Sequence, residues 1–255
     1  MRNSIAIITD FGLKDWFTAS MKAVIFSINP NANIIDICHD IPQGDIQKAA
    51  FCLYASHNFF PKGTIFLAVV DPGVGSKRKA IAVKTTEHFF IGPDNGVLSL
   101  CINKYQSYEI RLLENKNFFL KEISSTFHGR DIFAPVAAYL SRGVSFNKVG
   151  TKTNNFITLS FNKVEETKKY FIGKIIYIDI FGNAITNFPI SFASKIKSIY
   201  VKNKKIPLKK CYSDVGKNEF LSLPGSCGFI EISANCNSAE KLLKLKVDDK
   251  LIAEK

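Results

Sequence analysis

The feature that most constrains the fold is a continuous apolar run, TIFLAVV at residues 64–70, which is followed at once by Asp71. Such a run without polar alternation is typical of a β-strand that is buried on both faces, as in parallel sheets. Two shorter strands are predicted before it, at Ser4–Ile8 and Ile34–Cys38, and segments with helical spacing separate the three. The β-α-β-α-β order predicts a largely parallel sheet with right-handed crossovers.

The helical segments carry their own start and stop signals. Asp45 is a plausible N-cap of the second helix. A later helix, from Asp131 to about Leu140, tolerates Pro135 because first-turn amides have no acceptor within the helix. The other elements expected in this half are a helix between Asp15 and Pro30 and strands at Ala80–Lys84 and Phe89–Ile91.

The sequence changes character at residues 162–170, where polar and charged residues follow one another without glycine. The patterns beyond are those of short strands and one short amphipathic helix. The sequence therefore predicts an N-terminal α/β domain, residues 1–165, and a smaller β-rich, barrel-like domain, residues 170–255. Strands are expected at Phe171–Ile178, Ile196–Val201, Phe220–Leu223, Phe229–Ser233 and Lys250–Ala253, and the helix at Ala239–Leu243.

Composition indicates a globular protein, because hydrophobic residues make up 46% of the chain and charged residues 22%. No apolar run approaches the roughly 20 residues that span a bilayer. The first apolar run breaks at Asp10 and lacks the length and cleavage site of a signal peptide. We therefore expect a cytoplasmic protein with no membrane partner.

The net charge of +12 suggests a nucleic-acid partner, but most of the basic residues are lysines and they are widely spread along the chain. Only five of the 34 are arginine, and no dense basic stripe interleaved with aromatic residues is present. The densest runs, Lys168-Lys169 and Lys202 to Lys210, are interpreted as solvated faces or hairpins. The charge pattern argues against nucleic acid.

The usual signatures of metal and cofactor sites are also missing. The six cysteines are scattered without a Cys-x-x-Cys pair, which favours free thiols. The glycine-rich stretch Gly73 to Lys77 lacks the spacing of a phosphate-binding loop, and no G-x-G-x-x-G is present. We therefore expect no metal and no cofactor.

Four polar, glycine-containing clusters follow the predicted strands of the first half: TDFG at 9–12, VDPGVGSKR at 70–78, GPDNG at 92–96 and FHGRD at 127–131. In open α/β sheets, ligands bind beyond the carboxyl ends of the strands. Asp10 and Asp71 both follow strands that are predicted to be parallel, so their carboxylates should emerge at one edge. Either residue alone could merely cap a loop or a helix.

Two further features leave alternatives open. The second half carries a polar cluster beside Phe181, which could face a ligand or could be a turn in which Asn183 satisfies backbone groups. His39, after the second strand, could be catalytic or could form structural hydrogen bonds. The other members of the cluster are Asp179, Thr186 and Asn187.

Taken together, the motifs resemble the SAM hydroxide adenosyltransferase (SAM hydrolase) family, which is related to the fluorinases and chlorinases. The resemblance covers essentially the whole chain. It is carried by TDFGLKDWF, SMKAVI, IIDICHDI, VVDPGVGSKRKAIAV, GPDNGVLS, FHGRDIFAPVAA, DIFGNAITN and GSCGFIEIS. It implies an α/β domain followed by a β-rich domain, and homotrimers with the substrate between subunits.

The resemblance also implies residue roles. Asp71, Arg78 and His128 match the family's water-activating triad, and Asp10 matches the carboxylate that holds the ribose hydroxyls. The sequence departs from the family pattern at Cys227, Ser233 and Cys236, so the adenine contacts rest on the weakest matches. The other residues that match substrate-binding positions are Asp179, Phe181, Asn183, Tyr212, Ser226, Phe229 and Ala234.

The implied reaction is hydrolysis of S-adenosyl-L-methionine (SAM) to adenosine and L-methionine by attack of water on the ribose C5′. The sulfonium makes methionine a neutral leaving group, so the remaining difficulty is to position and deprotonate water. The sequence leaves Asp71 and His128 both open as proton acceptors. Two alternatives are halide-dependent adenosyl transfer and a non-catalytic adenosine- or SAM-binding protein. Asp71 and the short segment between Arg78 and Gly92 disfavour the halogenase.

Overall fold

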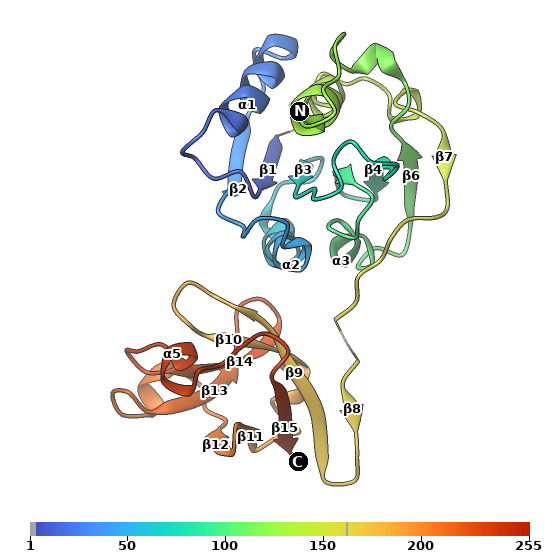
Figure 1. Ribbon diagram of the computed structural model, residues 1–255. Helices are drawn as coiled ribbons and strands as arrows, with labels where there is room; N and C mark the ends of the chain where they lie inside the picture. The colour runs from blue at the N-terminus through green and yellow to red at the C-terminus, as the bar shows by residue number, and fades with distance from the viewer. Residues whose placement is uncertain (1–3, 162) are drawn as a thin grey trace. The chain divides into compact units, whose positions relative to one another are not determined.

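The computed structural model describes residues 4–161 and 163–255, which form two compact units (Figure 1). The first unit ends at Leu159 and the second begins at Ser160. Among the described residues, no helix is both long enough and apolar enough to cross a membrane.

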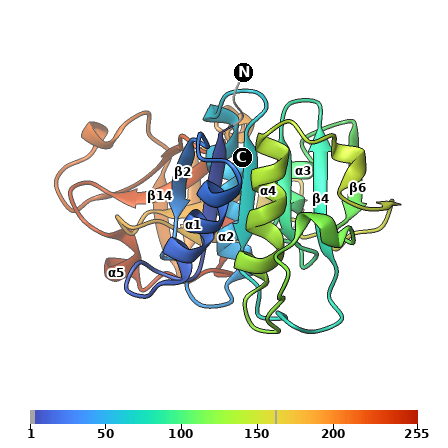
Figure 2. The same ribbon diagram turned by 90° about the horizontal axis from the view of Figure 1, so that it is seen from above.

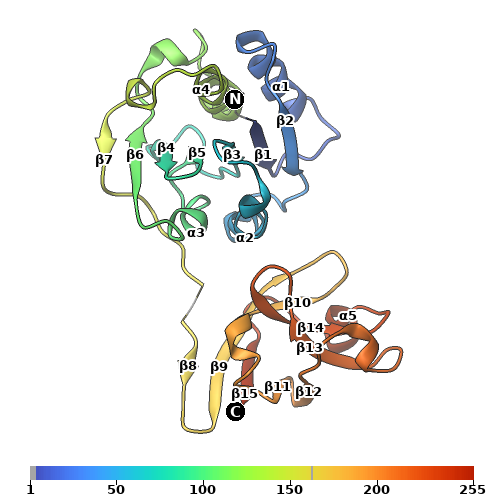
Figure 3. The ribbon, with the colours of Figure 1, turned by 180° about the vertical axis from the view of Figure 1, so that it is seen from behind.

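The N-terminal unit is built on a seven-stranded sheet with the order β2-β1-β3-β5-β4-β6-β7, which can be followed across Figure 3. The strands β2, β1, β3 and β5 pair in parallel, whereas β4, β6 and β7 continue the sheet with antiparallel pairs. This confirms the predicted α/β class. The strands are β1 Ile5–Thr9, β2 Ile34–Cys38, β3 Ile65–Val69, β4 Ala80–Thr85, β5 Phe89–Pro93, β6 Tyr108–Leu112 and β7 Lys152–Thr153.

Helices cover both faces of this sheet, with α1 and α4 on one side and α2 and α3 on the other (Figures 1 and 2). Ile5 and Ile7 point into the core beneath α1 and α4, while Ala6 and Ile8 point into the core beneath α2. This alternation requires an apolar residue at every position, which explains the unbroken apolar strands. The helices are α1 Phe17–Ile28, α2 Ile46–Ser56, α3 Ser99–Ile102 and α4 Ala134–Ser141.

Local signals explain where two of these helices start. The Asp45 carboxylate accepts a hydrogen bond from the Lys48 backbone N–H at 2.9 Å, so the predicted N-cap is confirmed. Pro135 lies in the first turn of α4, where a missing N–H costs little. The predicted start of this helix at Asp131 is wrong, because one turn of π-helix, η3 Gly129–Phe133, precedes α4.

The connection between β3 and β4, residues 70–79, is shorter than the dozen or more residues of a parallel crossover. β4 accordingly runs antiparallel to β5, and Ala80 at its start pairs with Pro93 at the end of β5. The amino end of β4 therefore lies at the same edge as the carboxyl ends of β3 and β5.

The C-terminal unit is a strongly bent antiparallel sheet with the order β12-β11-β15-β9-β10-β14-β13, and β8 pairs with β9. The two ends of this order meet at Ser222, where its carbonyl accepts from the Lys209 N–H at 2.8 Å. The sheet is thus nearly closed, which confirms the predicted barrel-like, β-rich class. The elements are β8 Glu165–Glu166, β9 Tyr170–Ile178, β10 Ala184–Pro189, β11 Ser198–Val201, β12 Lys204–Pro207, β13 Phe220–Pro224, β14 Phe229–Ala234, α5 Ala239–Leu243 and β15 Lys250–Glu254.

Short 3-10 turns complete the two units, and one basic run is also explained. Lys202 and Asn203 form the tight turn between β11 and β12, with the positive φ angles that such hairpins need. Residues 202–207 of the Lys202 to Lys210 run therefore belong to a hairpin, as one of the two interpretations predicted. The 3-10 turns are η1 His57–Phe59, η2 Lys116–Phe118, η4 Phe146–Lys148, η5 Ile190–Phe192 and η6 Tyr212–Asp214.

The packing of β3 gives a prediction about stability. Phe66 is fully buried and stacks on Phe90, with ring centroids 5.1 Å apart. Phe66→Ala should therefore reduce the free energy of unfolding by about 3–5 kcal/mol, the usual cost of deleting a buried phenylalanine. Phe59→Ala is the matched control, because this side chain is 80% exposed and its loss should cost less than about 0.5 kcal/mol. Urea denaturation followed by circular dichroism measures both, and equal effects would contradict the assignment of the core.

Candidate active site

The carboxyl ends of β1 and β3 place two carboxylates at one edge of the N-terminal sheet. Asp10 follows β1, Asp71 lies two residues after β3, and the strands are in parallel register. Both residues line one pocket of about 740 Å³, together with aromatic side chains and backbone of neighbouring loops. The other residues lining the pocket are Phe11, Asp15, Phe17, Gln43, Gly44, Pro72, Thr126 and Phe127.

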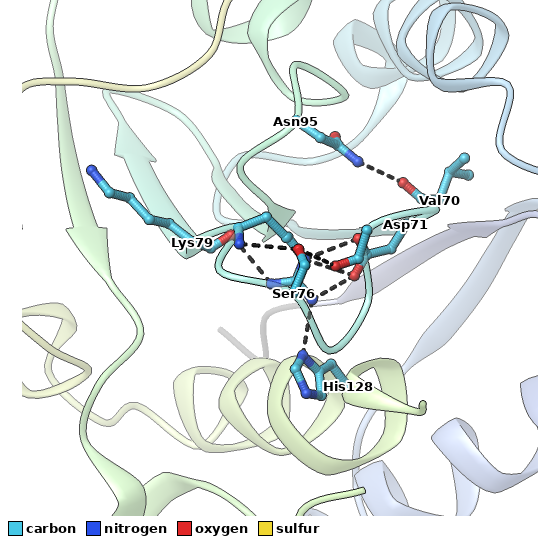
Figure 4. A network of polar contacts seen from close by, with 8 residues as sticks. Val70, Asp71, Ser76, Lys79, Asn95 and His128 are labelled. Carbon is cyan, nitrogen blue, oxygen red and sulfur yellow. Dashed lines mark hydrogen bonds and ion pairs between the residues drawn. The ribbon is translucent and has the colours of Figure 1, made fainter. Parts of the chain in front are cut away.

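Asp71 and His128, which are labelled in Figure 4, are joined through Arg78 into one connected group. Arg78 Nε lies 2.9 Å from each oxygen of the Asp71 carboxylate, and Arg78 Nη2 donates to Asp71 Oδ2 at 2.5 Å. The same Nη2 lies 3.0 Å from His128 Nδ1. The Asp71 and Arg78 side chains are largely buried, with 5% and 11% exposure, so this is a desolvated, charge-assisted pair.

The chain reaches this geometry because β4 runs opposite to β3. Arg78 precedes β4, and the amino end of β4 lies at the edge where Asp71 leaves β3. Asn95, from the GPDNG motif, donates its side-chain N–H to the Val70 carbonyl at 2.8 Å and so supports the loop (Figure 4). The Arg78 guanidinium also packs over the ring of Phe133, 5.2 Å from its centroid.

The surroundings of His128 favour its neutral form. Burial lowers its pKa first, and the nearby Arg78 charge lowers it further, while the Asp71 and Asp131 charges act in the opposite direction. The net pKa lies below the usual value of 6.5. Because a guanidinium can only donate, His128 Nδ1 must be the acceptor of this contact. The hydrogen of the neutral ring is then on Nε2.

Asp10 occupies the other part of the pocket. Its Oδ2 accepts from the Gly44 N–H at 2.8 Å. Burial raises the pKa of this carboxyl, and the Asp71 charge adds to the rise, while the Gly44 N–H opposes it. Asp10 is therefore a partly buried acceptor that faces the pocket.

The predicted residues of the second half lie within the C-terminal unit, but several are already used by the fold. Asp179 accepts from the Phe181 and Asn183 N–H groups at 2.9 and 2.8 Å, and from the Asn183 side chain at 2.9 Å. Asp179 and Asn183 therefore hold a turn, which leaves Phe181 76% exposed. Two members of the polar cluster, Thr186 and Asn187, are buried in β10.

The remaining predicted residues lie along β14 and the segments beside it. The Tyr212 hydroxyl donates to Glu231 Oε1 at 2.5 Å, and burial together with Glu231 raises the Tyr212 pKa to about 12. Ser226 lies in the turn between β13 and β14. Phe229 and Ala234 are on β14 with their side chains buried, so any contact of theirs with a ligand is restricted to the few exposed atoms.

Sequence reasoning missed Glu231 and Asp131 as parts of these networks. Asp131 belongs to the FHGRD motif, so its motif membership was an available signal, whereas Glu231 sits in an alternating strand and gives no local signal. His39 serves the structure: its Nδ1 lies 2.8 Å from Thr9 Oγ1 and its Nε2 lies 3.0 Å from Asp36 Oδ1. Within residues 4–161 and 163–255, no group of three or more His, Cys, Asp or Glu side chains could hold a metal ion.

Comparison with known proteins gives matches over almost the whole chain. A curated protein named (R)-S-adenosyl-L-methionine hydrolase from Thermus thermophilus is 32% identical, covering 95% of this chain and 96% of the relative. A fluorinase from Nocardia brasiliensis is more distant, at 23% identity over 96% of this chain and 94% of the relative. The crystal structure of an uncharacterized conserved protein from Thermotoga maritima superposes with a TM-score of 0.93 at 40% identity, covering 98% of this chain and 100% of the other.

The family assignment follows from two separate regions of the chain. Residues 5–150 match the SAM hydroxide adenosyltransferase N-terminal domain, and residues 173–252 match the corresponding C-terminal domain. These regions contain the Asp71–Arg78–His128 group and the turn held by Asp179, respectively. The chain belongs to the SAM hydroxide adenosyltransferase family.

Proposed function

We propose that this protein hydrolyses S-adenosyl-L-methionine to adenosine and L-methionine by attack of water on the ribose C5′. The observation that carries the proposal is the Asp71–Arg78–His128 group beside the pocket that also contains Asp10. The similarity to a named SAM hydrolase over almost the full length of both chains supports the same reaction.

The hydrogen bonds around Arg78 support Asp71 as the proton acceptor. His128 Nδ1 accepts from Arg78 and its Nε2 carries a hydrogen, so the ring has no free lone pair for a proton from water. Asp71 has acceptor capacity left beyond its bonds to Arg78, because a carboxylate offers about four lone-pair sites. Asp71 is therefore the general base, and the His128 Nε2–H orients the water by donating to one of its lone pairs.

The bonds formed and broken in the reaction balance, and no general acid is needed. The water oxygen forms a bond to C5′ while the C5′–S bond breaks and its electron pair goes to sulfur. The positive charge of the sulfonium is thereby neutralised, and methionine leaves as a neutral thioether. The water proton passes to Asp71, and Arg78 stabilises the hydroxide character that develops before this transfer is complete.

The remaining predicted residues complete the substrate site. Asp10 holds the ribose hydroxyls as a partly buried acceptor. The methionine and adenine portions are assigned to residues of the C-terminal unit, and the chain's own residues with water suffice for the reaction, without metal or cofactor. These residues are Asp179, Phe181, Asn183, Tyr212, Ser226, Phe229 and Ala234.

A halide-using reaction is disfavoured by electrostatics, although fluorinases are among the relatives. A halide ion that attacked C5′ from the water position would lie next to the Asp71 carboxylate, and like charges in a buried site repel strongly. A non-catalytic SAM-binding protein would have no use for a desolvated Asp71–Arg78 pair, which costs free energy to bury. Both observations favour the hydrolase.

The assembly and location belong to the same proposal. We infer a cytoplasmic homotrimer in which residues of both halves of the chain contribute to one substrate site. The trimer is what the family resemblance implies, the location is the expectation from the sequence, and the placing of the Asp71 group and Tyr212 in different units agrees with a site that needs both halves of the chain.

The products of the reaction distinguish hydrolysis from halide transfer. The purified protein should convert SAM into equal amounts of adenosine and methionine, and neither EDTA nor added halide should change the rate. In ¹⁸O-labelled water the label should appear in the 5′-hydroxyl of adenosine, as measured by chromatography coupled to mass spectrometry. Unlabelled adenosine, or a 5′-halo nucleoside as the main product, would contradict the proposed attack.

Substitutions at the triad and at Asp10 should affect different steps. Asp71→Asn and His128→Ala should lower kcat about 10²-fold or more, the usual effect of losing acid–base assistance, with little change in SAM binding. Asp10→Ala should instead weaken binding, because the ribose hydroxyls lose their acceptor. Steady-state kinetics and calorimetric titration with SAM distinguish the two classes. Full activity of Asp71→Asn would remove Asp71 from the role of general base.

A site shared between subunits should allow two inactive variants to complement each other. Light scattering should give a trimer mass, and mixing inactive Asp71→Asn with inactive Asn183→Ala should restore part of the activity after subunits exchange. Recovery is expected because some mixed sites would combine an intact half from each variant. The control is the same mixture with exchange prevented by cross-linking. An active monomer would rule out the shared site.

A further inference from the structure

Asp131 is a fully buried carboxylate that the proposed mechanism does not use. Its Oδ1 accepts from Arg130 Nε at 2.6 Å, and its Oδ2 accepts from Arg130 Nη2 at 3.1 Å. Oδ2 also accepts from the Ser124 backbone N–H at 2.8 Å. Burying a charge is costly unless its hydrogen bonds are satisfied, and here both oxygens are occupied.

Asp131 holds one segment of chain, residues 120–127, at two points, one through its side chain and one through its backbone carbonyl. The Ser124 N–H binds the side chain, and the Leu120 N–H binds the Asp131 carbonyl at 2.9 Å. Segment 120–127 ends immediately before His128, and its Thr126 and Phe127 line the pocket that contains Asp10.

The same segment touches the loop that carries the rest of the triad. Gly75 lies between Asp71 and Arg78 with φ +77°, and a Cβ there would be 2.3 Å from the Ser125 carbonyl oxygen. Only glycine permits this approach of the two backbones. Segment 120–127 is therefore fixed by Asp131 and in contact with the Asp71–Arg78 loop.

The π-helical turn that follows His128 is also tightly packed. At Gly129 a Cβ would lie 3.2 Å from Met21 Sδ and 3.3 Å from Val69 Cγ1, so the π-helical turn that follows His128 rests directly on α1 and the end of β3. π-Helical turns of this kind occur frequently at functional sites. Because α1 and β3 hold the turn that follows His128, the position of His128 depends on segment 120–127, which precedes it.

We propose that Asp131 is a positioning residue for the hydrolysis. By anchoring segment 120–127 against the Gly75 turn, it sets the contact between Arg78 and His128. The inference rests on the proposed function, and it assigns to Asp131 a role in the rate of the chemical step rather than in substrate affinity. A displacement of about 1 Å at a catalytic group can cost up to about 10²-fold in rate.

The pH dependence of kcat is a readout that the loss of a purely structural contact would not change. The charged groups that act on His128 are Arg78 and Asp71 from the loop after β3 and Asp131 from its own turn, while Met21 and Val69 are apolar. His128 must be neutral to accept from Arg78, so kcat should fall as the pH falls through its pKa. The Asp131 charge raises that pKa. Removing the charge should therefore move the acid limb of kcat to lower pH.

The test is Asp131→Asn in the full-length protein, which keeps the size and shape of the side chain but removes its charge. It leaves one acceptor oxygen where the Ser124 N–H and the Arg130 guanidinium now share two, so the anchor is weakened. We expect kcat to fall about 10-fold to 100-fold, KM to change less than about threefold, and the acid limb to move to lower pH. Arg130→Gln leaves the Asp131 charge in place, so it should slow the reaction without moving the acid limb to lower pH. Product formation at saturating SAM across a pH series gives all of these values.

Asp249→Asn is the matched control, because Asp249 likewise binds a backbone N–H (Lys246, 2.8 Å) and a cation (Lys202, 3.1 Å). It should leave kcat and the pH profile unchanged. If Asp131→Asn behaves like this control while the wild-type protein hydrolyses SAM, the inference is overturned and the proposed function stands; an inactive wild-type protein would instead count against the proposed function. Should Asp131→Asn fail to fold, an unchanged kcat in Arg130→Gln overturns the inference and a slowed one supports it.

Discussion

The contact on which the site depends is the one between Arg78 and its two neighbours. A guanidinium donates hydrogen bonds and accepts none, and it keeps its charge at any physiological pH. It therefore orients both partners at once: the Asp71 carboxylate accepts from it through both oxygens, and His128 accepts from it through Nδ1. The proposed roles of Asp71 as general base and His128 as the group that orients the water therefore both follow from their hydrogen bonds to Arg78.

The sequence was sufficient wherever the signal is local. The unbroken apolar run of β3 predicted a strand buried on both faces, and the two parallel strands predicted that Asp10 and Asp71 share an edge. Asp45 was predicted as a cap because N-cap chemistry involves residues only three apart. The triad itself came from resemblance, since no periodicity links Asp71 to His128.

The features that the sequence did not predict depend on hydrogen-bond partners that lie far apart in the sequence. β10 was missed because Thr186 and Asn187 were placed in a polar cluster that could face a ligand or form a turn, whereas the fold buries them in a strand. Thr186 donates to the Ile230 carbonyl at 2.7 Å, and Asn187 accepts from the Lys174 N–H at 2.8 Å. A buried polar residue is indistinguishable from an exposed one until its partner is known. The bond between Tyr212 and Glu231 and the anchoring of Ser124 by Asp131 were unpredictable for the same reason.

The reversal of β4 also has a consequence for the order in which the protein folds. It allows Asp71 and Arg78, which are seven residues apart, to meet through a short loop, whereas His128 joins Arg78 from fifty residues away. The entropy lost on closing a loop grows with its length, so the short-range pair has the lower cost of formation. We therefore expect the ion pair to form early and the histidine to dock late. By the same reasoning, local opening would separate the histidine before the ion pair, so activity would be lost on heating before the sheet unfolds.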